Sequence, residues 1–133
     1  MADDVAIIRD GYEAFARGDV PAVLAVLDPD IEWTEPEGYP WGRVFRGHDD
    51  VVGLFQTAAQ MLGPDWRVVP DRIVGTDDGV LVTGRHTGTG PDGPFEVPFA
   101  MVWEMRDGRA VRFRQYGDSV LMRRAAGVPV GRS

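Results

Sequence analysis

The sequence contains no cysteine and only two histidines, His48 and His86. Without cysteine there can be no disulfide bond, no thiolate nucleophile and no cysteine-ligated zinc site. Two histidines also disfavour a multi-histidine metal centre. We therefore expect neither a metal nor a cofactor, and any chemistry has to come from the other side chains.

Long apolar runs and an excess of basic residues are missing as well. No stretch approaches the ~20 apolar residues of a membrane-spanning helix, and the acidic segment 1–4 differs from the basic, then apolar layout of a signal peptide. The formal net charge of −7 disfavours binding to nucleic acid or to an anionic membrane. We expect a cytoplasmic protein with neither partner, and we interpret the arginines between Arg106 and Arg124 as a solvated or ion-paired surface.

The composition is that of one globular domain with many turns. Hydrophobic residues make up 44% of the 133 residues, enough for a single core, and 17 glycines and 10 prolines predict tight turns. We predict a single domain over residues 1–133, with a frayed tail at residues 128–133.

The spacing of hydrophobic residues differs between the first and the second half of this domain. Three- and four-residue spacing predicts three helices in the first half, ending at Gly18, running from Asp19 to about residue 27, and spanning about residues 48–62. A short fourth helix is predicted over residues 118–126. Strand-like patterns cover residues 31–35, 66–74, 80–87, 95–105 and 110–116. Because hairpins join the last four strands, we expect a largely antiparallel sheet with helices on one face and a cavity between them.

Glu35 is the best candidate for a chemical role. Ile31, Trp33 and Glu35 share one face of a strand that Pro36 ends, so a carboxylate lies on an apolar face. Burial raises the pKa of a carboxyl group and makes it a better base near neutral pH. The alternative is an exposed Glu35 at the strand end that only solvates the following loop.

Four segments resemble the SnoaL-like, ketosteroid isomerase-like branch of the nuclear-transport-factor-two-like superfamily. They are residues 12–19 (YEAFARGD), 27–33 (LDPDIEW), 45–47 (FRG) and 106–116 (RDGRAVRFRQY). The resemblance implies an α+β fold in which a curved, antiparallel or mixed sheet wraps around three helices as a cone-shaped barrel with a central pocket. It also implies a homodimer through the sheet, with Trp66, Val68 and the outward side of 95–105 as contacts.

The resemblance bears on Glu35 and two further positions. In ketosteroid isomerases the catalytic aspartate precedes a proline at this point, where this chain has Glu35-Pro36. The second acid of those enzymes falls near Met101, and their helix-one tyrosine lies about one residue from Tyr12. The two groups that donate hydrogen bonds to the oxyanion in those enzymes therefore have no exact counterpart in this sequence.

Similar epoxide hydrolases use an arginine and two aspartates, which fall at Arg85, Thr87 and Gln115. An inward Arg85 would pair with Glu35 or bind a substrate oxygen; the alternative is a surface arginine. His86 must then point the other way, as a proton shuttle or a structural residue. Asp118 is either a pocket acid, as in polyketide cyclases, or the cap of the C-terminal turn.

Aromatic residues are candidate walls of the pocket or plain core, and we expect Trp41, in a Gly-Pro-rich loop, to act as a lid. These residues are Trp33, Tyr39, Trp41, Trp103 and Phe113.

The sequence thus predicts a cofactor-independent pocket enzyme in which Glu35 moves a proton next to a carbonyl of a small, hydrophobic, oxygenated ligand. Isomerisation, cyclisation and dehydration stay open. A non-catalytic binding or assembly module and an epoxide hydrolase are the alternatives. A second proton donor within reach of a buried Glu35 would favour an enzyme.

Overall fold

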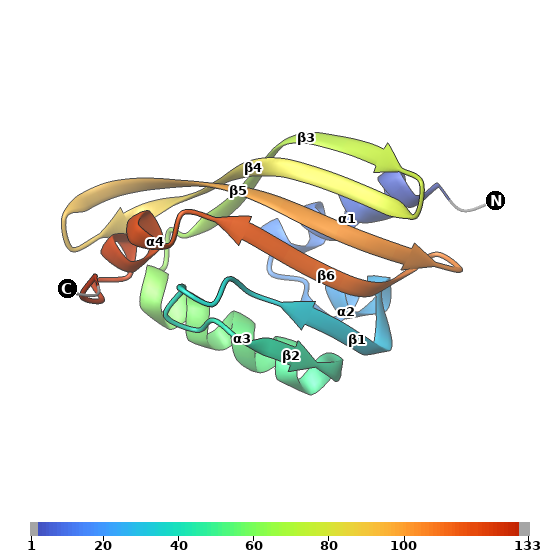
Figure 1. Ribbon diagram of the computed structural model, residues 1–133, viewed down its shortest axis with the longest axis horizontal. Helices are drawn as coiled ribbons and strands as arrows, with labels where there is room; N and C mark the ends of the chain where they lie inside the picture. The colour runs from blue at the N-terminus through green and yellow to red at the C-terminus, as the bar shows by residue number, and fades with distance from the viewer. Residues whose placement is uncertain (1–2, 131–133) are drawn as a thin grey trace.

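A six-stranded mixed sheet forms one layer of the molecule, and α1, α2 and α3 pack against one of its faces (Figure 1). The computed structural model describes residues 3–130. The strand order is β2-β1-β6-β5-β4-β3, and only the β1–β6 pair is parallel. The strands are β1 (Leu27–Thr34), β2 (Val44–Arg46), β3 (Arg67–Thr76), β4 (Gly79–Gly90), β5 (Gly93–Arg106) and β6 (Arg109–Gly117). The predicted α+β fold with a curved mixed sheet is confirmed.

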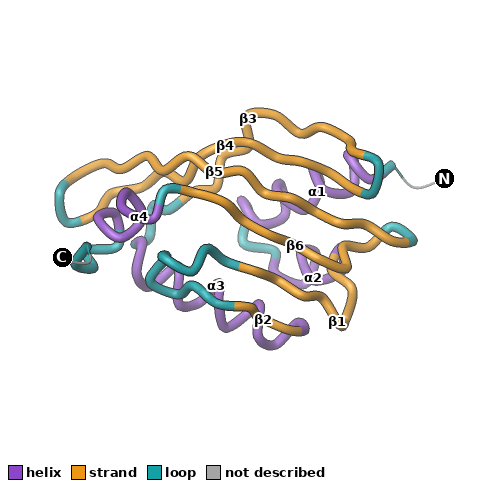
Figure 2. Tube along the Cα trace, viewed as in Figure 1, coloured by secondary structure: helices purple, strands orange, loops and turns teal. Residues whose placement is uncertain are grey.

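Three of the four helices begin after an aspartate that accepts hydrogen bonds from free backbone N–H groups, whereas the third helix, which follows Arg46, has no side-chain cap. The helices are α1 (Asp4–Ala16), α2 (Val20–Val26), α3 (Gly47–Leu62) and α4 (Ser119–Ala125). Asp3 accepts from the N–H groups of Val5 and Ala6, and Asp19 accepts from that of Ala22. Figure 2 shows α4 near the hairpin that joins β4 and β5, and it packs against these two strands. Within residues 3–130, no helix combines the length and the apolar character that crossing a membrane requires.

Local differences from the predicted elements lie mostly at strand ends. The short strand β2 was not predicted, because three residues are too few for a periodic signal. The segment at residues 28–30, which lies between the predicted second helix and the first predicted strand, belongs to β1, whose pairing with β6 shifts register between Leu27 and Glu32. Of the predicted frayed tail, residues 128–130 have no regular structure and residues 131–133 lie outside the described residues.

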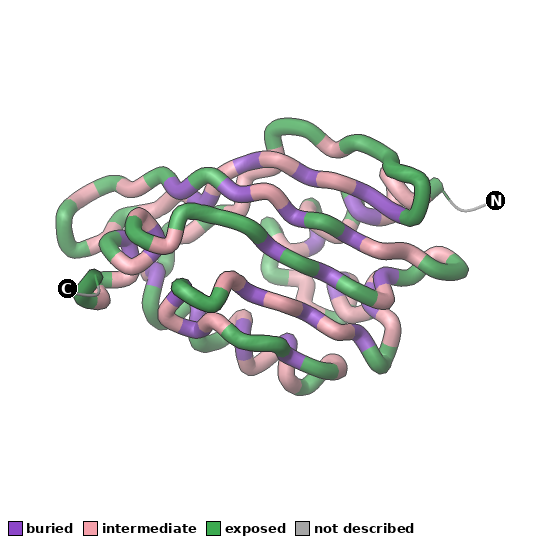
Figure 3. The backbone as a smooth tube through the Cα atoms, viewed as in Figure 1, coloured by how far each residue is buried: buried purple, intermediate pink, exposed green. Residues whose placement is uncertain are grey.

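The face of the sheet toward the helices is apolar, as the alternation of buried and exposed residues along the strands shows (Figure 3). Trp33 of β1, Phe113 of β6 and Trp103 of β5 are in register across three neighbouring strands. The rings of Trp33 and Phe113 stack with centroids 3.8 Å apart, and Trp103 meets Phe113 edge-on at 4.6 Å. This aromatic cluster forms the floor of the core.

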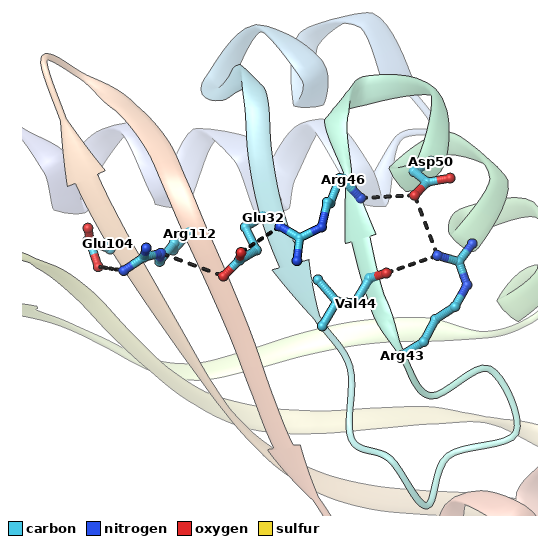
Figure 4. Close-up of polar contacts among 7 residues, drawn as sticks. All are labelled: Glu32, Arg43, Val44, Arg46, Asp50, Glu104 and Arg112. Carbon is cyan, nitrogen blue, oxygen red and sulfur yellow. Dashed lines mark hydrogen bonds and ion pairs between the residues drawn. The ribbon is translucent and has the colours of Figure 1, made fainter.

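Charged side chains occupy the opposite face. Glu32 of β1 pairs with Arg46 of β2 at 2.7 Å and with Arg112 of β6 at 3.6 Å (Figure 4). Arg112 also lies 3.7 Å from Glu104 of β5. Such exposed pairs contribute little to stability. The prediction of an ion-paired arginine surface is confirmed for Arg112.

Atoms of the two neighbouring strands, β3 and β5, approach Gly84 closely. This residue is buried in β4 opposite Pro70, and an added methyl group would overlap the Val69 carbonyl oxygen and lie 2.9 Å from the Phe99 ring. We expect G84A to lower the free energy of unfolding by about 1–3 kcal/mol. The matched variant G53A, in α3 with nothing within 4 Å, should raise it by up to about 1 kcal/mol. Denaturant unfolding followed by tryptophan fluorescence measures both, and equal stability of G84A and wild type would contradict the prediction.

Candidate active site

A cavity lies between the sheet and helices α1, α2 and α3. Its volume is about 80 Å³. Most of the lining is apolar or aromatic and includes all four tryptophans of the chain. The other polar groups that line it are Tyr12, Glu35, His86 and Gln115. The structure therefore brings together a few polar side chains in an otherwise apolar space.

Glu35 follows β1 on the inner face of the sheet and is 5% exposed. Its carboxylate accepts four hydrogen bonds, all from neutral donors. The indole N–H of Trp33 lies 2.7 Å from Oε2 and that of Trp41 lies 2.9 Å from Oε1. The Gln115 amide nitrogen donates to both oxygens, at 2.9 and 3.0 Å. Within residues 3–130, no arginine or histidine forms an ion pair with Glu35.

Burial has the largest effect on the pKa of the Glu35 carboxyl group. It raises the pKa of Glu35 to about 7, because an ion is poorly solvated in an apolar cavity. The hydrogen bonds from Trp41, Trp33 and Gln115 stabilise the anion and partly offset that rise. Both protonation states of Glu35 are therefore accessible near neutral pH.

A second hydrogen-bonded group lies behind Gln115. His86 Nε2 is 2.7 Å from Gln115 Oε1, and the Trp66 indole nitrogen is 3.1 Å from His86 Nδ1. His86 is 3% exposed, and burial lowers its pKa to about 4. The imidazole is therefore neutral at physiological pH.

Tyr12 of α1 is a separate polar group of the cavity. Its hydroxyl accepts from the indole N–H of Trp103 at 3.1 Å and donates to the Met101 sulfur at 2.9 Å. Burial raises the pKa of Tyr12 above its ordinary value, so the phenol keeps its proton. Because a thioether is a weak acceptor, this O–H is available to a stronger one.

Arg85 and Thr87 do not line the cavity, and of the two alternatives for Arg85 the structure has the surface arginine. Side chains alternate along β4, so the inward His86 places both of its neighbours on the outer face. There Arg85 pairs with Asp71 and, at 3.3 Å, with Glu96. It cannot serve as a partner of Glu35.

Asp118 also lies away from the cavity. It is exposed and caps α4, accepting from the Leu121 N–H at 3.0 Å, as the alternative interpretation expected.

Tyr39 is buried beside Trp41, with ring centroids 5.6 Å apart, but does not line the cavity. Its hydroxyl has no hydrogen-bond partner among residues 3–130. Phe113 supports the cavity wall by stacking on Trp33.

Trp41 is a wall of the cavity, and it also borders an outer groove of about 430 Å³ at the start of α3. It is 8% exposed and is the one residue shared by the linings of the two spaces among residues 3–130. The expectation of a mobile lid stays a prediction.

Sequence reasoning misplaced Trp66 and Val68. Both were expected at a dimer contact, yet both line the cavity, and the Trp66 ring packs 5.5 Å from Phe15 of α1. Their two-residue spacing is the signal that places them on one face, but it does not say which face is inside. Within the described chain, no three histidine, aspartate or glutamate side chains gather into a group that could hold a metal.

Comparison with known proteins places this geometry in a family. The model of the SnoaL-like domain matches residues 8–113. An NTF2-like protein of unknown function from Burkholderia pseudomallei is 33% identical, with a TM-score of 0.86 over 95% of this chain and 98% of that one. TerC, crystallised with polyporic acid, is 28% identical, with a TM-score of 0.85 over 93% and 98%.

A third solved structure shares the fold at lower identity. This protein from Catenulispora acidiphila has a ketosteroid isomerase-like fold and was solved with trimethylamine. It is 17% identical, with a TM-score of 0.78 over 96% of each chain, so the likeness concerns the fold alone. With a family model that spans most of the sequence and these solved neighbours, the chain belongs to the SnoaL-like domain family of NTF2-like proteins.

Proposed function

We propose that this protein is a cofactor-independent enzyme in which Glu35 moves a proton next to a carbonyl group of a small hydrophobic substrate. The observation that carries the proposal is one buried carboxylate facing an apolar cavity, with a pKa of about 7. A group with this pKa takes up and releases a proton at neutral pH, as a general base and acid must.

Tyr12 is the proposed electrophilic partner, in place of Arg85. As a substrate carbonyl loses a neighbouring proton, negative charge develops on its oxygen, and a prepared O–H donor stabilises it. The Tyr12 hydroxyl can exchange its weak Met101 acceptor for such an oxygen. The indole N–H of Trp103 donates to the phenol oxygen and orients it.

The dimensions of the cavity favour a compact substrate. Its volume of about 80 Å³ is well below the roughly 300–1,000 Å³ of pockets for drug-sized ligands. A polycyclic molecule would require wall side chains such as Trp41 to move. The relative crystallised with polyporic acid supports a small-molecule ligand for this chain.

Among the reaction types, isomerisation, cyclisation and dehydration need only the one acid–base group. Epoxide hydrolysis with two acids is less well supported, because Glu35 is the single carboxylate that lines the cavity in residues 3–130. We also propose a cytoplasmic homodimer through the outer face of the sheet. There Val102 of β5 and Tyr116 of β6 are 40% and 51% exposed, and both are available to contact a second copy.

The first test is the loss of proton transfer without Glu35. We expect the wild-type protein to accelerate hydrogen–deuterium exchange next to the carbonyl of a small ketone, in a panel including cyclopentanone, cyclohexanone and 2-cyclohexenone, followed by NMR in D₂O. Replacing the carboxylate by an amide in E35Q should lower this rate by about 10²-fold or more. The control R85Q, on the outer face, should keep it. Undiminished exchange in E35Q would refute the assignment.

The pH dependence of the same exchange is a second test. Only ionised Glu35 acts as the base, and its pKa is raised to about 7. The rate should therefore increase about tenfold per pH unit below that value and level off above it. A titration of the Glu35 carboxyl carbon by ¹³C NMR should give the same midpoint. A rate that is constant from pH 5 to pH 8 would contradict the role of Glu35.

A second candidate function is binding of a small organic cation without catalysis. The observation in its favour is that ionised Glu35 has neutral donors but no charged partner in the described chain, and that tryptophans surround the cavity. An ammonium group bearing methyl groups would supply the missing charge and pack against aromatic rings.

Calorimetry with trimethylammonium would test this candidate. The ligand stays charged between pH 5.5 and 8.5, whereas Glu35 becomes ionised as the pH passes about 7. Affinity should therefore increase with pH over this range, and E35Q should lose most of it. The neutral control tert-butanol should bind weakly and independently of pH. If both ligands bind equally at pH 8.5, the cation hypothesis fails.

A further inference from the structure

Four side chains from distant parts of the sequence form one hydrogen-bonded chain that ends on Glu35. Trp66, just before β3, contacts His86 of β4 at 3.1 Å, and His86 contacts Gln115 of β6 at 2.7 Å. Gln115 then contacts both oxygens of Glu35, at 2.9 and 3.0 Å. His86 and Gln115 are 3% and 5% exposed, so water hardly competes for these bonds.

The direction of every hydrogen bond in this chain follows from its first member. An indole N–H can only donate, so His86 Nδ1 must be the unprotonated, accepting nitrogen. The neutral imidazole then carries its proton on Nε2 and donates it to the Gln115 amide oxygen. That contact leaves the amide N–H groups directed at Glu35. The reversed amide would bring its oxygen against the carboxylate and lose both bonds.

We propose that His86, oriented by Trp66, is a positioning residue that fixes the Gln115 amide with its N–H donors on the Glu35 carboxylate. This inference deepens the proposed role of Glu35 as the acid–base group. His86 makes no contact with the carboxylate among the hydrogen bonds of the structure and acts on it through Gln115. The consequence is a stabilised anion, and therefore control over the pH at which Glu35 ionises.

Few other groups near the cavity titrate or carry charge. Tyr12 on α1 and Tyr39 in the loop after β1 both have pKa values raised by burial and stay neutral. His86 is the titratable group that β4 contributes, and with a pKa of about 4 it stays neutral while Glu35 titrates. The parts of α2 and α3 that line the cavity are apolar. A substitution of His86 or Gln115 would therefore alter the pKa of Glu35 through hydrogen bonds from neutral donors, and not through a change in nearby charge.

The test is a ¹³C NMR titration of Glu35 in the free protein, without any substrate, using carboxyl-labelled glutamate and E35Q for assignment. Q115M removes the donor and should raise the pKa of Glu35 by about one unit. H86L should raise it by part of that amount. H86Q should stay within a few tenths of wild type, because its amide can accept from Trp66 and donate to Gln115. In Q115M, adding H86L should cause no further shift.

Two results would overturn the proposal. One is an unchanged pKa in H86L beside a raised pKa in Q115M, which would mean that Gln115 needs no support. The other is the same H86L shift with and without Q115M, which would mean that His86 acts by another route. Should H86L fail to fold, ¹H–¹⁵N spectra of wild-type His86 decide the matter, since a proton on Nδ1 contradicts the chain. Ketone exchange that persists in E35Q would refute the proposed function but leave this inference intact.

Discussion

The site depends on allowing one buried carboxyl group to ionise near neutral pH without a counter-ion. Transfer of an ion from water into an apolar cavity is costly unless donors replace the lost hydration. Here Trp33, Trp41 and Gln115 supply those donors from β1, from the loop after it and from β6. The parallel pairing of β1 with β6 brings these segments together, although Glu35 and Gln115 are 80 residues apart in the chain. The hydrogen bonds that stabilise the Glu35 carboxylate therefore depend on the order of the strands in the sheet.

The tryptophans meet the need for hydrogen-bond donors in a particular way. Each of the four lines the cavity and donates its indole N–H to a specific acceptor: Glu35 for Trp33 and Trp41, His86 for Trp66, and Tyr12 for Trp103. One kind of residue thus supplies both the apolar wall and the oriented donors. The cavity can stay almost free of charge while two functional groups, a carboxylate and a phenol, are held in fixed directions.

Local patterns predicted much of this arrangement. The two-residue period placed Glu35 on the same face as Trp33, and the same period required His86 and Arg85 to point in opposite directions. It could not say which of the two faces the cavity, because that choice depends on how β4 pairs with its neighbours and on where the helices pack. The chain from Trp66 to Glu35 was missed for the same reason. Its members come from four separate segments of the chain and share no motif in the sequence.

The outward position of Arg85 has a chemical consequence. A guanidinium against Glu35 would lower the pKa of the carboxyl group and leave a weakly basic anion at neutral pH. Burial without donors would have the opposite effect and leave the group protonated. Neutral hydrogen-bond donors lie between these extremes and are consistent with a pKa of about 7. His86 fits the same logic, because its own pKa of about 4 prevents it from becoming a cation where Glu35 ionises. The histidine can therefore support the site without changing its charge.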